Sequence, residues 1–454
     1  MKNVFLTGTA MIAFATAGLA QTNTATLNQN GNTQTASQTQ TGNYLKSTIT
    51  QDKMGNVNTG NFAATLQTST GAAGNEAAVT QSNGAKSNRG FVTQSGGTGN
   101  LGTITQSNAS GGGALAVTGA TSAAAVKAAG GNWGGIFQKG NNNTNTYIIQ
   151  SNVSSGNFGE IAQYGNSNRQ TAIDQSNIST NNTANIYQGT AGLGVTNDRA
   201  VVAQQGNSSD NIATVTQTTS SNDAVVTQND LSYNNQATVK QIGGTGSSAT
   251  ILQKNSTFGV ATVDQRNSDN VGTITQLNGS FDEKASILQL GYSNQAAIVQ
   301  DNDYHGVASV TQNGYLNTAN IDQVYGGGIA AGTGNTATIT QDLLTTAGAY
   351  NVAYIKQGDG TTLSKNNTAT ITQEYSYNTA KLSQVGDGNT GTFSQFGDYN
   401  VIKGLSGDFA IQQGNNNTLT VSQNSGGSAP YVANIASVSQ IGNGNMGTIT
   451  QSRD

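Results

Sequence analysis

Few residues in this sequence are of types that catalyse reactions. His305 is the only histidine, so a histidine-based catalytic triad would have no alternative base. It lies next to a turn, close to Asp303, where a solvated turn residue is the expected role. A polysaccharide-cleaving β-helix would need paired carboxylates or a metal, but the candidate aspartates occur singly in turns, at Asp359, Asp387, Asp398 and Asp408. The sequence therefore predicts no catalytic, cofactor or metal site, and no enzyme.

Two glycine-rich segments and one tryptophan are the remaining candidates for ligand binding. Gly96-Gly-Thr-Gly99 and Gly243-Gly-Thr-Gly246 are similar to the start of the calcium-binding motif GGxGxD, but Leu101 and Ser248 stand where that motif requires aspartate. Flexible turns are the better interpretation of both segments. Trp133 is expected to cover the neighbouring layer of the fold, with carbohydrate stacking as the alternative.

Carboxamide side chains, by contrast, recur throughout the chain at fixed spacing. The seven-residue unit Asn-x-Ala-x-Ile/Val-x-Gln occurs about thirty times, and "NTATITQ" appears unchanged at 335–341 and 367–373. Some copies replace the first Asn, as at Ser247, Gly259, Glu283 and Gly306. Fixed and variable positions alternate along the seven-residue unit with a period of two, which is typical of a β-strand with one buried face. Gly, Asn, Asp and Ser between the units predict turns.

The spacing of the units indicates how the strands are grouped. Glutamines from Gln217 to Gln312 follow each other at steps of about 11 to 13, and pairs of steps sum to about 24. Two strands therefore form one rung. The prediction is an all-β fold, a β-solenoid with two strands per rung and about fifteen rungs, hydrogen-bonded along the stack as in cross-β structures.

Stacking explains why carboxamides recur on the inward face, where an unpaired amide would cost a few kcal/mol. Rungs lie about 4.8 Å apart, so each carboxamide can donate to one neighbour and accept from the next. The predicted ladder residues are Asn211, Gln217, Asn294, Gln300, Asn317, Gln323, Asn335, Gln341, Asn367, Gln373, Asn389, Gln395, Asn445 and Gln451. The predicted core residues between them are Ala213, Val215, Ala296, Ile298, Ala337, Ile339, Ala369, Ile371 and Ile449.

Composition agrees with a repetitive, exported protein. Only 34% of the 454 residues are hydrophobic and the formal charge is −4, so an ordinary globular core is not expected and no basic surface for nucleic acid is predicted. Residues 1–20 have a charged start, an apolar run and small residues, as in a secretory signal peptide. No later segment is long and apolar enough for membrane insertion. The sequence after residue 20 divides into two parts. Residues 21–42 form an Asn/Gln/Thr-rich segment, and residues 43–454 contain the repeats, with a Gly/Ala-rich insert at 107–131.

The repeats resemble those of a known family. Gln289-Leu-Gly291-Tyr-Ser-Asn294-Gln-Ala296-Ala-Ile-Val-Gln300 matches the pattern Gln-x-Gly-x-x-Asn-x-Ala-x-x-x-Gln of curlin, the subunit of bacterial curli fibres, and the segment from Gln312 to Gln323 matches it too. The resemblance implies a secreted fimbrial protein that forms functional amyloid in the biofilm matrix and promotes cell adhesion. It also implies export through a curli secretion pore, growth from a nucleator subunit, and self-association. Curlins have about five repeats, whereas about fifteen are expected here.

Two alternatives to a fibre subunit remain, an ice-binding solenoid and a monomeric adhesin. Ranks of threonine such as Thr338-Ile-Thr340 and Thr370-Ile-Thr372 are typical of ice-binding surfaces, but Lys240, Asp264, Asp322 and Lys356 occupy the same repeat positions and would interrupt a uniform array. An adhesin is expected to have a cap or a separate binding domain. The last repeat, Asn445 to Gln451, runs almost to the end of the sequence, so open ends that template further subunits are expected instead.

Overall fold

The computed structural model describes residues 11–12, 23–31, 33–52, 60–69, 74–82, 87–107, 131–189, 194–324, 334–342, 350–362, 364–425 and 433–452. These residues form β-strands joined by turns, and no helix occurs among them. The chain divides into two compact units, Met1–Tyr233 and Asn234–Asp454. Most of the predicted signal peptide and of the predicted insert lies outside the described residues.

Unit 1 contains two sheets of parallel strands. Sheet I consists of β2 (Thr24–Gln29), β4 (Lys46–Gln51), β6 (Glu76–Ser82), β8 (Leu101–Ser107), β10 (Thr146–Ser151), β12 (Thr171–Ser176), β15 (Arg199–Gln205) and β17 (Asp223–Asn229). Sheet II consists of β3 (Thr35–Thr41), β5 (Phe62–Thr68), β7 (Arg89–Ser95), β9 (Trp133–Lys139), β11 (Phe158–Asn166), β13 (Thr183–Gln188) and β16 (Ile212–Gln217). The short strands β1 (Met11–Ile12) and β14 (Val195–Thr196) pair with β3 and with the end of β11.

Unit 2 is built in the same way. Sheet III consists of β18 (Gln236–Gln241), β20 (Val260–Gln265), β22 (Lys284–Gln289), β24 (Val307–Gln312), β26 (Thr336–Asp342), β28 (Thr368–Glu374), β30 (Thr390–Phe396), β33 (Thr418–Asn424) and β36 (Met446–Ser452). Sheet IV consists of β19 (Ser248–Lys254), β21 (Val271–Leu277), β23 (Gln295–Asp301), β25 (Thr318–Val324), β27 (Val352–Gln357) and β29 (Thr379–Val385). It ends in two split strands, β31 (Val401–Lys403) with β32 (Ala410–Gln413), and β34 (Ile435–Ser437) with β35 (Ser439–Ile441).

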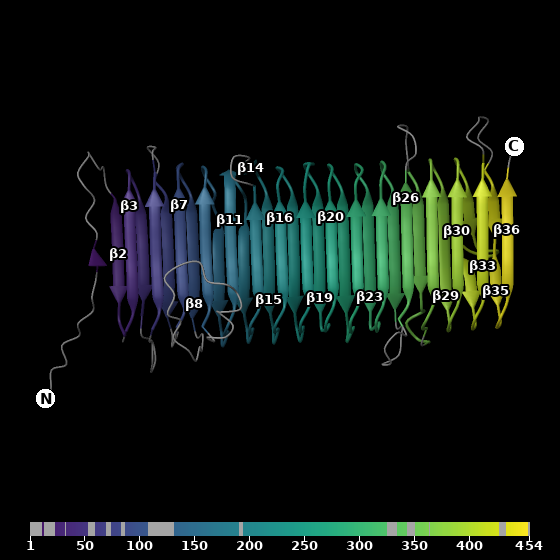
Figure 1. Ribbon diagram of the computed structural model, residues 1–454, viewed down its shortest axis with the longest axis horizontal. Helices are drawn as coiled ribbons and strands as arrows, with labels where there is room; N and C mark the ends of the chain where they lie inside the picture. Colours follow the sequence, from purple (N-terminus) through teal and green to yellow (C-terminus); the bar gives the residue numbers. More distant parts are fainter. Residues whose placement is uncertain are drawn as a thin grey trace. The chain divides into compact units, whose positions relative to one another are not determined.

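Apart from β14 and the split strands of sheet IV, successive strands alternate between the two sheets of a unit, so each rung contains one strand, whole or split, from each sheet. Within a unit the strands of one sheet point the same way and those of the other point the opposite way (Figure 1). Every strand pair is parallel and in register, as in Ile321 opposite Ile298 and Ile355 opposite Ile321. The predicted two-strand β-solenoid is therefore confirmed.

The core of each unit is a thin layer between its two sheets. Along a strand such as β28 the buried positions alternate with half-exposed ones, because side chains point to opposite faces. Ala369 and Ile371 are 0% exposed, and Phe393 in the next rung is the bulkiest fully buried side chain. A core of Ala, Ile and Val buries only a modest apolar area per rung. Burial of each large side chain stabilises the fold by about 1.5–3 kcal/mol. Repetition of that contribution, together with backbone pairing along the stack, replaces a globular core.

Left-handed backbone conformations bend the chain from one sheet to the other. Asn181, Asp210, Asn234 and Asp282 all have φ between 53° and 56°, and each immediately precedes the buried Asn or Glu that leads into a strand. Asn and Asp adopt this conformation more readily than other residues that carry a Cβ atom. The turn composition seen in the sequence thus has a conformational cause.

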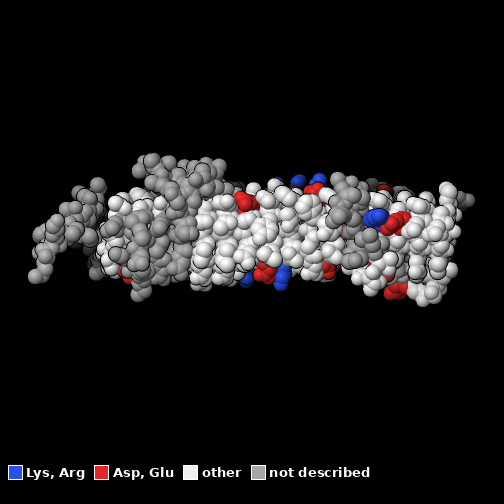
Figure 2. Space-filling model, turned by 90° about the horizontal axis from the view of Figure 1, so that it is seen from below, with Lys and Arg blue, Asp and Glu red and all other residues white. Residues whose placement is uncertain are grey.

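Charged side chains are sparse on the surface. In the view of Figure 2, Lys, Arg, Asp and Glu lie singly or in small groups of mixed sign, and most of the described surface is neither basic nor acidic. Within the described part of the chain, no helix has the length and apolar character needed to cross a membrane.

Candidate functional site: carboxamide ladders and strand edges

The inward glutamines of each sheet form one continuous column. Each Gln Nε2 donates to the Oε1 of the glutamine one rung further along the chain, at 2.7–3.0 Å. In unit 1 the columns are Gln29, Gln51, Gln81, Gln106, Gln150, Gln175, Gln204 and Gln228 in sheet I, and Gln40, Gln67, Gln94, Gln138, Gln163, Gln188 and Gln217 in sheet II.

Unit 2 has the same arrangement. Its columns are Gln241, Gln265, Gln289, Gln312, Gln341, Gln373, Gln395, Gln423 and Gln451 in sheet III, and Gln253, Gln276, Gln300, Gln323, Gln357, Gln384, Gln412 and Gln440 in sheet IV.

Most of these amides also bond across the core. The second N–H of Gln204 donates to the carbonyl oxygens of Thr183 and Asn211, at 3.1 and 3.2 Å, on the facing sheet. Gln204 is 0% exposed, so these bonds provide the partners that a buried amide requires. The glutamine columns therefore tie successive rungs together and also tie one sheet to the other.

The asparagine columns bond differently from the expectation of simple side-chain ladders. Asn157 Oδ1 accepts from the backbone N–H of Asn182 at 2.9 Å, and Asn157 Nδ2 donates to the carbonyl oxygen of Ser179 at 3.0 Å. Direct side-chain bonds occur in some rungs, as from Asn389 Nδ2 to Asn367 Oδ1 at 3.1 Å. The sequence analysis missed the serines. Their signal is a Ser three residues before the inward Asn, as at Ser154, Ser179, Ser208 and Ser232.

The structure places the predicted ladder and core residues on the inward face. In both units the predicted positions up to Gln395 are at most 4% exposed. The predicted residues of the last rung differ, because Asn445, Ile449 and Gln451 are only partly buried on β36. No strand among the described residues covers the outer edge of β36.

Three carboxyl groups are buried at positions that belong to the polar columns. Asp198 occupies an Asn position between Asn168 and Asn222: its Oδ1 accepts from the Asn222 N–H at 2.9 Å, and its Oδ2 has no hydrogen-bond partner among the described residues. Burial raises the pKa of Asp198 to about 7, although the bond from Asn222 opposes that shift. A buried oxygen without a partner disfavours the charged form, so a protonated carboxyl group suits this site better than a carboxylate.

The other two buried carboxyl groups lie in one corner of unit 2. Glu283 replaces the inward Asn, and Gly259 and Gly306 replace it in the rungs on either side. A side chain at Gly306 would overlap Asp303, so Asp303 fills the space that Asn occupies elsewhere. Burial raises the pKa of Asp303 to about 7 and raises that of Glu283 well above its usual value, with Asp303 adding to the effect on Glu283.

The residues first considered for catalysis are dispersed. His305 Nδ1 lies 3.1 Å from Asp282 Oδ2 rather than against Asp303. Asp359 accepts hydrogen bonds from the amides of Thr361 and Thr362, which lowers its pKa to about 2 and identifies it as a turn-forming residue. Among the described residues, no group of three or more His, Cys, Asp or Glu side chains could hold a metal ion.

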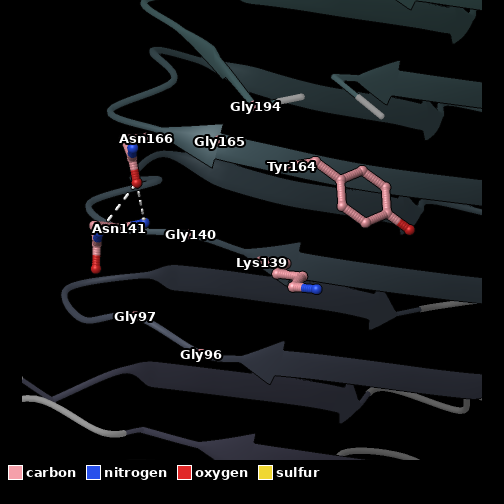
Figure 3. A pocket seen from close by; sticks show the side chains of 9 residues that line it. All are labelled: Gly96, Gly97, Lys139, Gly140, Asn141, Tyr164, Gly165, Asn166 and Gly194. Carbon is pink, nitrogen blue, oxygen red and sulfur yellow. Dashed lines mark hydrogen bonds between the residues drawn. The ribbon is translucent and has the colours of Figure 1, made fainter. Parts of the chain in front are cut away.

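Trp133 and the glycine-rich turns also have structural surroundings. Trp133 is 3% exposed and stacks on Phe158 with ring centroids 4.4 Å apart, so its ring faces are not open to a sugar. A concavity of about 380 Å³ lies over the turns of unit 1 and is lined by Gly96, Gly97, Lys139, Gly140, Asn141, Tyr164, Gly165, Asn166 and Gly194 (Figure 3).

That concavity follows from the turn geometry. A Cβ atom on Gly140, which has a φ of 129°, would overlap the carbonyl group of Gly165, so these turns pack closely on one another. The backbone N–H and the side-chain Nδ2 of Asn141 both donate to Asn166 Oδ1, at 2.8 and 3.1 Å. These bonds join adjacent rungs, and Lys139 is the one charged residue among those that line the concavity.

The charged residues expected to interrupt the threonine array are divided between the two faces of unit 2. Lys240 and Asp264 lie on β18 and β20 of sheet III. Asp322 and Lys356 lie on β25 and β27 of sheet IV. None of the four lies on the strands from β26 to β36 of sheet III that carry Thr338-Ile-Thr340 and Thr370-Ile-Thr372. Register from β18 to β26 nevertheless places Lys240 and Asp264 in the same outward column of sheet III as Thr340, so these two charges interrupt that column as expected. Asp322 and Lys356 lie on the other sheet and do not interrupt it.

The ladders have a direction, and their ends are chemically different. In the described residues Gln29 Oε1 on β2 and Gln40 Oε1 on β3 accept from no glutamine, although both Nε2 groups donate to the next rung. Gln440 and Gln451, at the last rung of unit 2, accept from Gln412 and Gln423 and have no further glutamine to donate to. One end of the chain thus presents acceptors and the other presents donors.

Comparison of the sequence with protein-family models and with curated proteins found no match to either.

Proposed function

We propose that this chain is an exported structural protein whose copies stack end to end into extracellular cross-β fibres, as the resemblance to curlin implies. The observation that carries the proposal is the polarity of the glutamine columns. Donors on the last rung of one copy can bond to acceptors on the first rung of the next, so the contact between copies would repeat the contact within each copy. Open strand edges of this kind are templates for further strands.

The register of such a joint follows from the sheets themselves. The next strand added after β36 would lie on β34 and β35, which places β2 of an incoming copy there and β3 on β36. Aligning Gln29 with Gln440 then brings Leu27 opposite Val438. Aligning Gln40 with Gln451 brings Gln38 opposite Ile449. The first pairing continues the apolar column, whereas the second brings a polar side chain against an apolar one.

Export would prepare the first edge for this joint. Met11 and Ile12, within the predicted signal peptide, pair with Ser37 and Gln38 on β3. Cleavage near Gln21 would remove that pairing and leave the β3 edge open to the last strand of another copy. A nucleator subunit, a curli-type secretion pore and a role in biofilm and cell adhesion belong to the same proposal and rest on the resemblance.

The first experiment asks whether the mature chain polymerises. Protein beginning at Gln21 is incubated and followed by electron microscopy and fibre diffraction. Fibres with a meridional repeat of about 4.7–4.8 Å are expected, because the strands lie across the long axis of the stack. Stable monomers at high concentration would contradict the proposal and favour the ice-binding or adhesin alternatives.

The second experiment tests the end-to-end joint. Ile449→Lys with Gln451→Lys places two charges on the inward side of β36, so we expect elongation from wild-type seeds to stop while circular dichroism retains the folded signal. The matched control, Ile298→Lys with Gln300→Lys on β23, should damage its own rung and leave both ends able to grow. Normal elongation by the terminal variant would refute the joint and favour lateral association.

A further inference from the structure

The last five strands of sheet III in unit 2 carry a nearly continuous set of outward hydroxyl side chains. On β26, β28, β30, β33 and β36, the three outward positions before the last inward Gln are Thr or Ser, with one exception, Met446. We call these residues the hydroxyl face. They are Thr336, Thr338, Thr340, Thr368, Thr370, Thr372, Thr390, Thr392, Ser394, Thr418, Thr420, Ser422, Thr448 and Thr450.

The hydroxyl face is accessible and regular. Its side chains are half-exposed or exposed, while the alternate positions of the same strands on β26 to β33 are buried. Register places Thr338, Thr370, Thr392, Thr420 and Thr448 in one column, one residue per strand. Charge occurs only at the margin, where Asp342 and Glu374 end the first two of these strands.

The opposite face of the same unit is different. Outward positions on β25, β27 and β29 of sheet IV include Asp322, Tyr354, Lys356 and Lys381. The Tyr354 hydroxyl donates to Asp322, and Lys381 Nζ lies 3.4 Å from Asp408 Oδ2. Threonine favours strands in general, but that preference applies to both sheets. It does not explain why the outward positions before the inward Gln carry no charge on β26 to β36 of sheet III, whereas the strands of sheet IV in the same unit carry several charges.

We propose that the hydroxyl face is the lateral contact through which fibres of this protein associate, so that its occupant is the hydroxyl face of a second copy. The proposal rests on the proposed function, because it needs fibres. A face without charge does not repel its own copy, and threonine or serine hydroxyls can bond to one another across the contact as both donors and acceptors. Identical faces of stacked strands form dry side-chain interfaces in cross-β assemblies.

The area of the face indicates when this contact forms. Five strands at ~4.8 Å span about 24 Å, and six residues at ~3.3 Å span about 20 Å, which gives about 500 Å² per copy and about 1,000 Å² in the pair. Stable protein pairs bury about 1,200–2,000 Å². Single copies should therefore associate weakly, whereas a fibre repeats the contact in every subunit and gains avidity. Filaments should form first and bundle afterwards.

Ice is the other partner that a regular threonine surface could fit, and the face is less suited to it. Matching a crystal lattice needs the same group at each lattice point, but one column of the face reads Thr340, Thr372, Ser394, Ser422 and Thr450. Serine lacks the methyl group of threonine. Contact with a second copy requires only uncharged side chains with hydrogen-bonding groups.

The test compares two double variants of the mature chain. Thr338→Lys with Thr392→Lys adds two charges to the hydroxyl face, on strands separated by β28. Thr318→Lys with Thr379→Lys makes the same replacements on the opposite face, on strands separated by β27. Filament width and bundling are measured by electron microscopy and by low-speed sedimentation of preformed filaments, and ice recrystallisation is measured alongside.

Wild-type and control filaments should bundle, whereas the variant of the hydroxyl face should give single filaments of normal length. The fraction of its filaments that sediments at low speed should be at least about tenfold lower than for wild type. High salt should restore its bundling, because screening at about 1 M shortens the range of charge repulsion to ~3 Å. Bundling of the face variant equal to wild type, or equal loss in both variants, would overturn the lateral contact. The lateral contact would also be overturned if wild type and control inhibit ice recrystallisation, the face variant does not, and all three bundle equally. Wild-type protein that forms no filaments would overturn the fibre proposal itself, and the lateral contact with it.

Discussion

Asp198→Asn should stabilise unit 1 at neutral and alkaline pH, and hardly affect it in acid. Asp198 occupies an asparagine position, is 0% exposed, and has an Oδ2 atom without a partner in the described structure. An asparagine there would be neutral, as are Asn168 and Asn222 in the rungs on either side. The substitution keeps the shape of the side chain and removes only the charge, so the effect reports the cost of the buried carboxylate.

The sign follows from the direction of the shift. Burial raises the pKa of Asp198 from 3.8 to about 7 in the folded chain, so between these values the folded state binds more protons than the unfolded state. Stability contributed by this group is therefore complete in acid and is lost as the pH rises from about 4 to about 7. Each pH unit in that window costs about 1.4 kcal/mol. Between pH 5 and pH 8 the wild type should lose about 3 kcal/mol relative to the variant.

Urea denaturation of the soluble, unpolymerised chain, followed by circular dichroism at pH 5 and pH 8, measures this difference. Taking the variant as reference cancels the pH dependence of Glu283 and Asp303, which are common to both proteins. The gap in unfolding free energy should widen by about 3 kcal/mol at the higher pH. An equal gap at both pH values, or a larger one at pH 5, would show that Asp198 is ionised in the folded chain and would refute the reasoning.

Further substitutions test the strand faces, the joint and the turns. Ile339→Asp buries an unpaired charge and should destabilise its rung by several kcal/mol, whereas Thr340→Asp on the outward face should change the midpoint of urea denaturation little; equal effects would reverse the assigned faces. Gln38→Ile should speed fibre elongation, measured from wild-type seeds, because it continues the apolar column toward Ile449; an unchanged rate would contradict the proposed register. Gly140→Ala should lower the thermal unfolding temperature more than Gly96→Ala, because a Cβ atom at Gly140 would overlap the next rung while Gly96 has open space around it.

The main architecture could be predicted from the sequence because its physical causes are local and repeated. Alternation along units such as 335–341 determines the strand, Asn, Asp and Gly determine the turns, and the interval of about 24 residues from Gln217 onward determines two strands per rung. A buried Gln that recurs at a fixed interval can be paired by the same group one rung away, so the repeat of Gln300 and Gln323 already indicates parallel, in-register stacking.

Only the tertiary structure decided what depends on the position of one rung relative to the next. Periodicity does not tell whether an inward Asn bonds to another Asn side chain or to a serine carbonyl, as Asn157 does. It does not show that Gly306 leaves space for Asp303, because that requires the turns to be superimposed. The charges at Asp322 and Lys356 share a repeat position with Thr340 but lie on the other sheet. Strands of the two sheets share the same sequence pattern. Only the structure shows which strands belong to which sheet, and therefore which outward side chains lie on the same face.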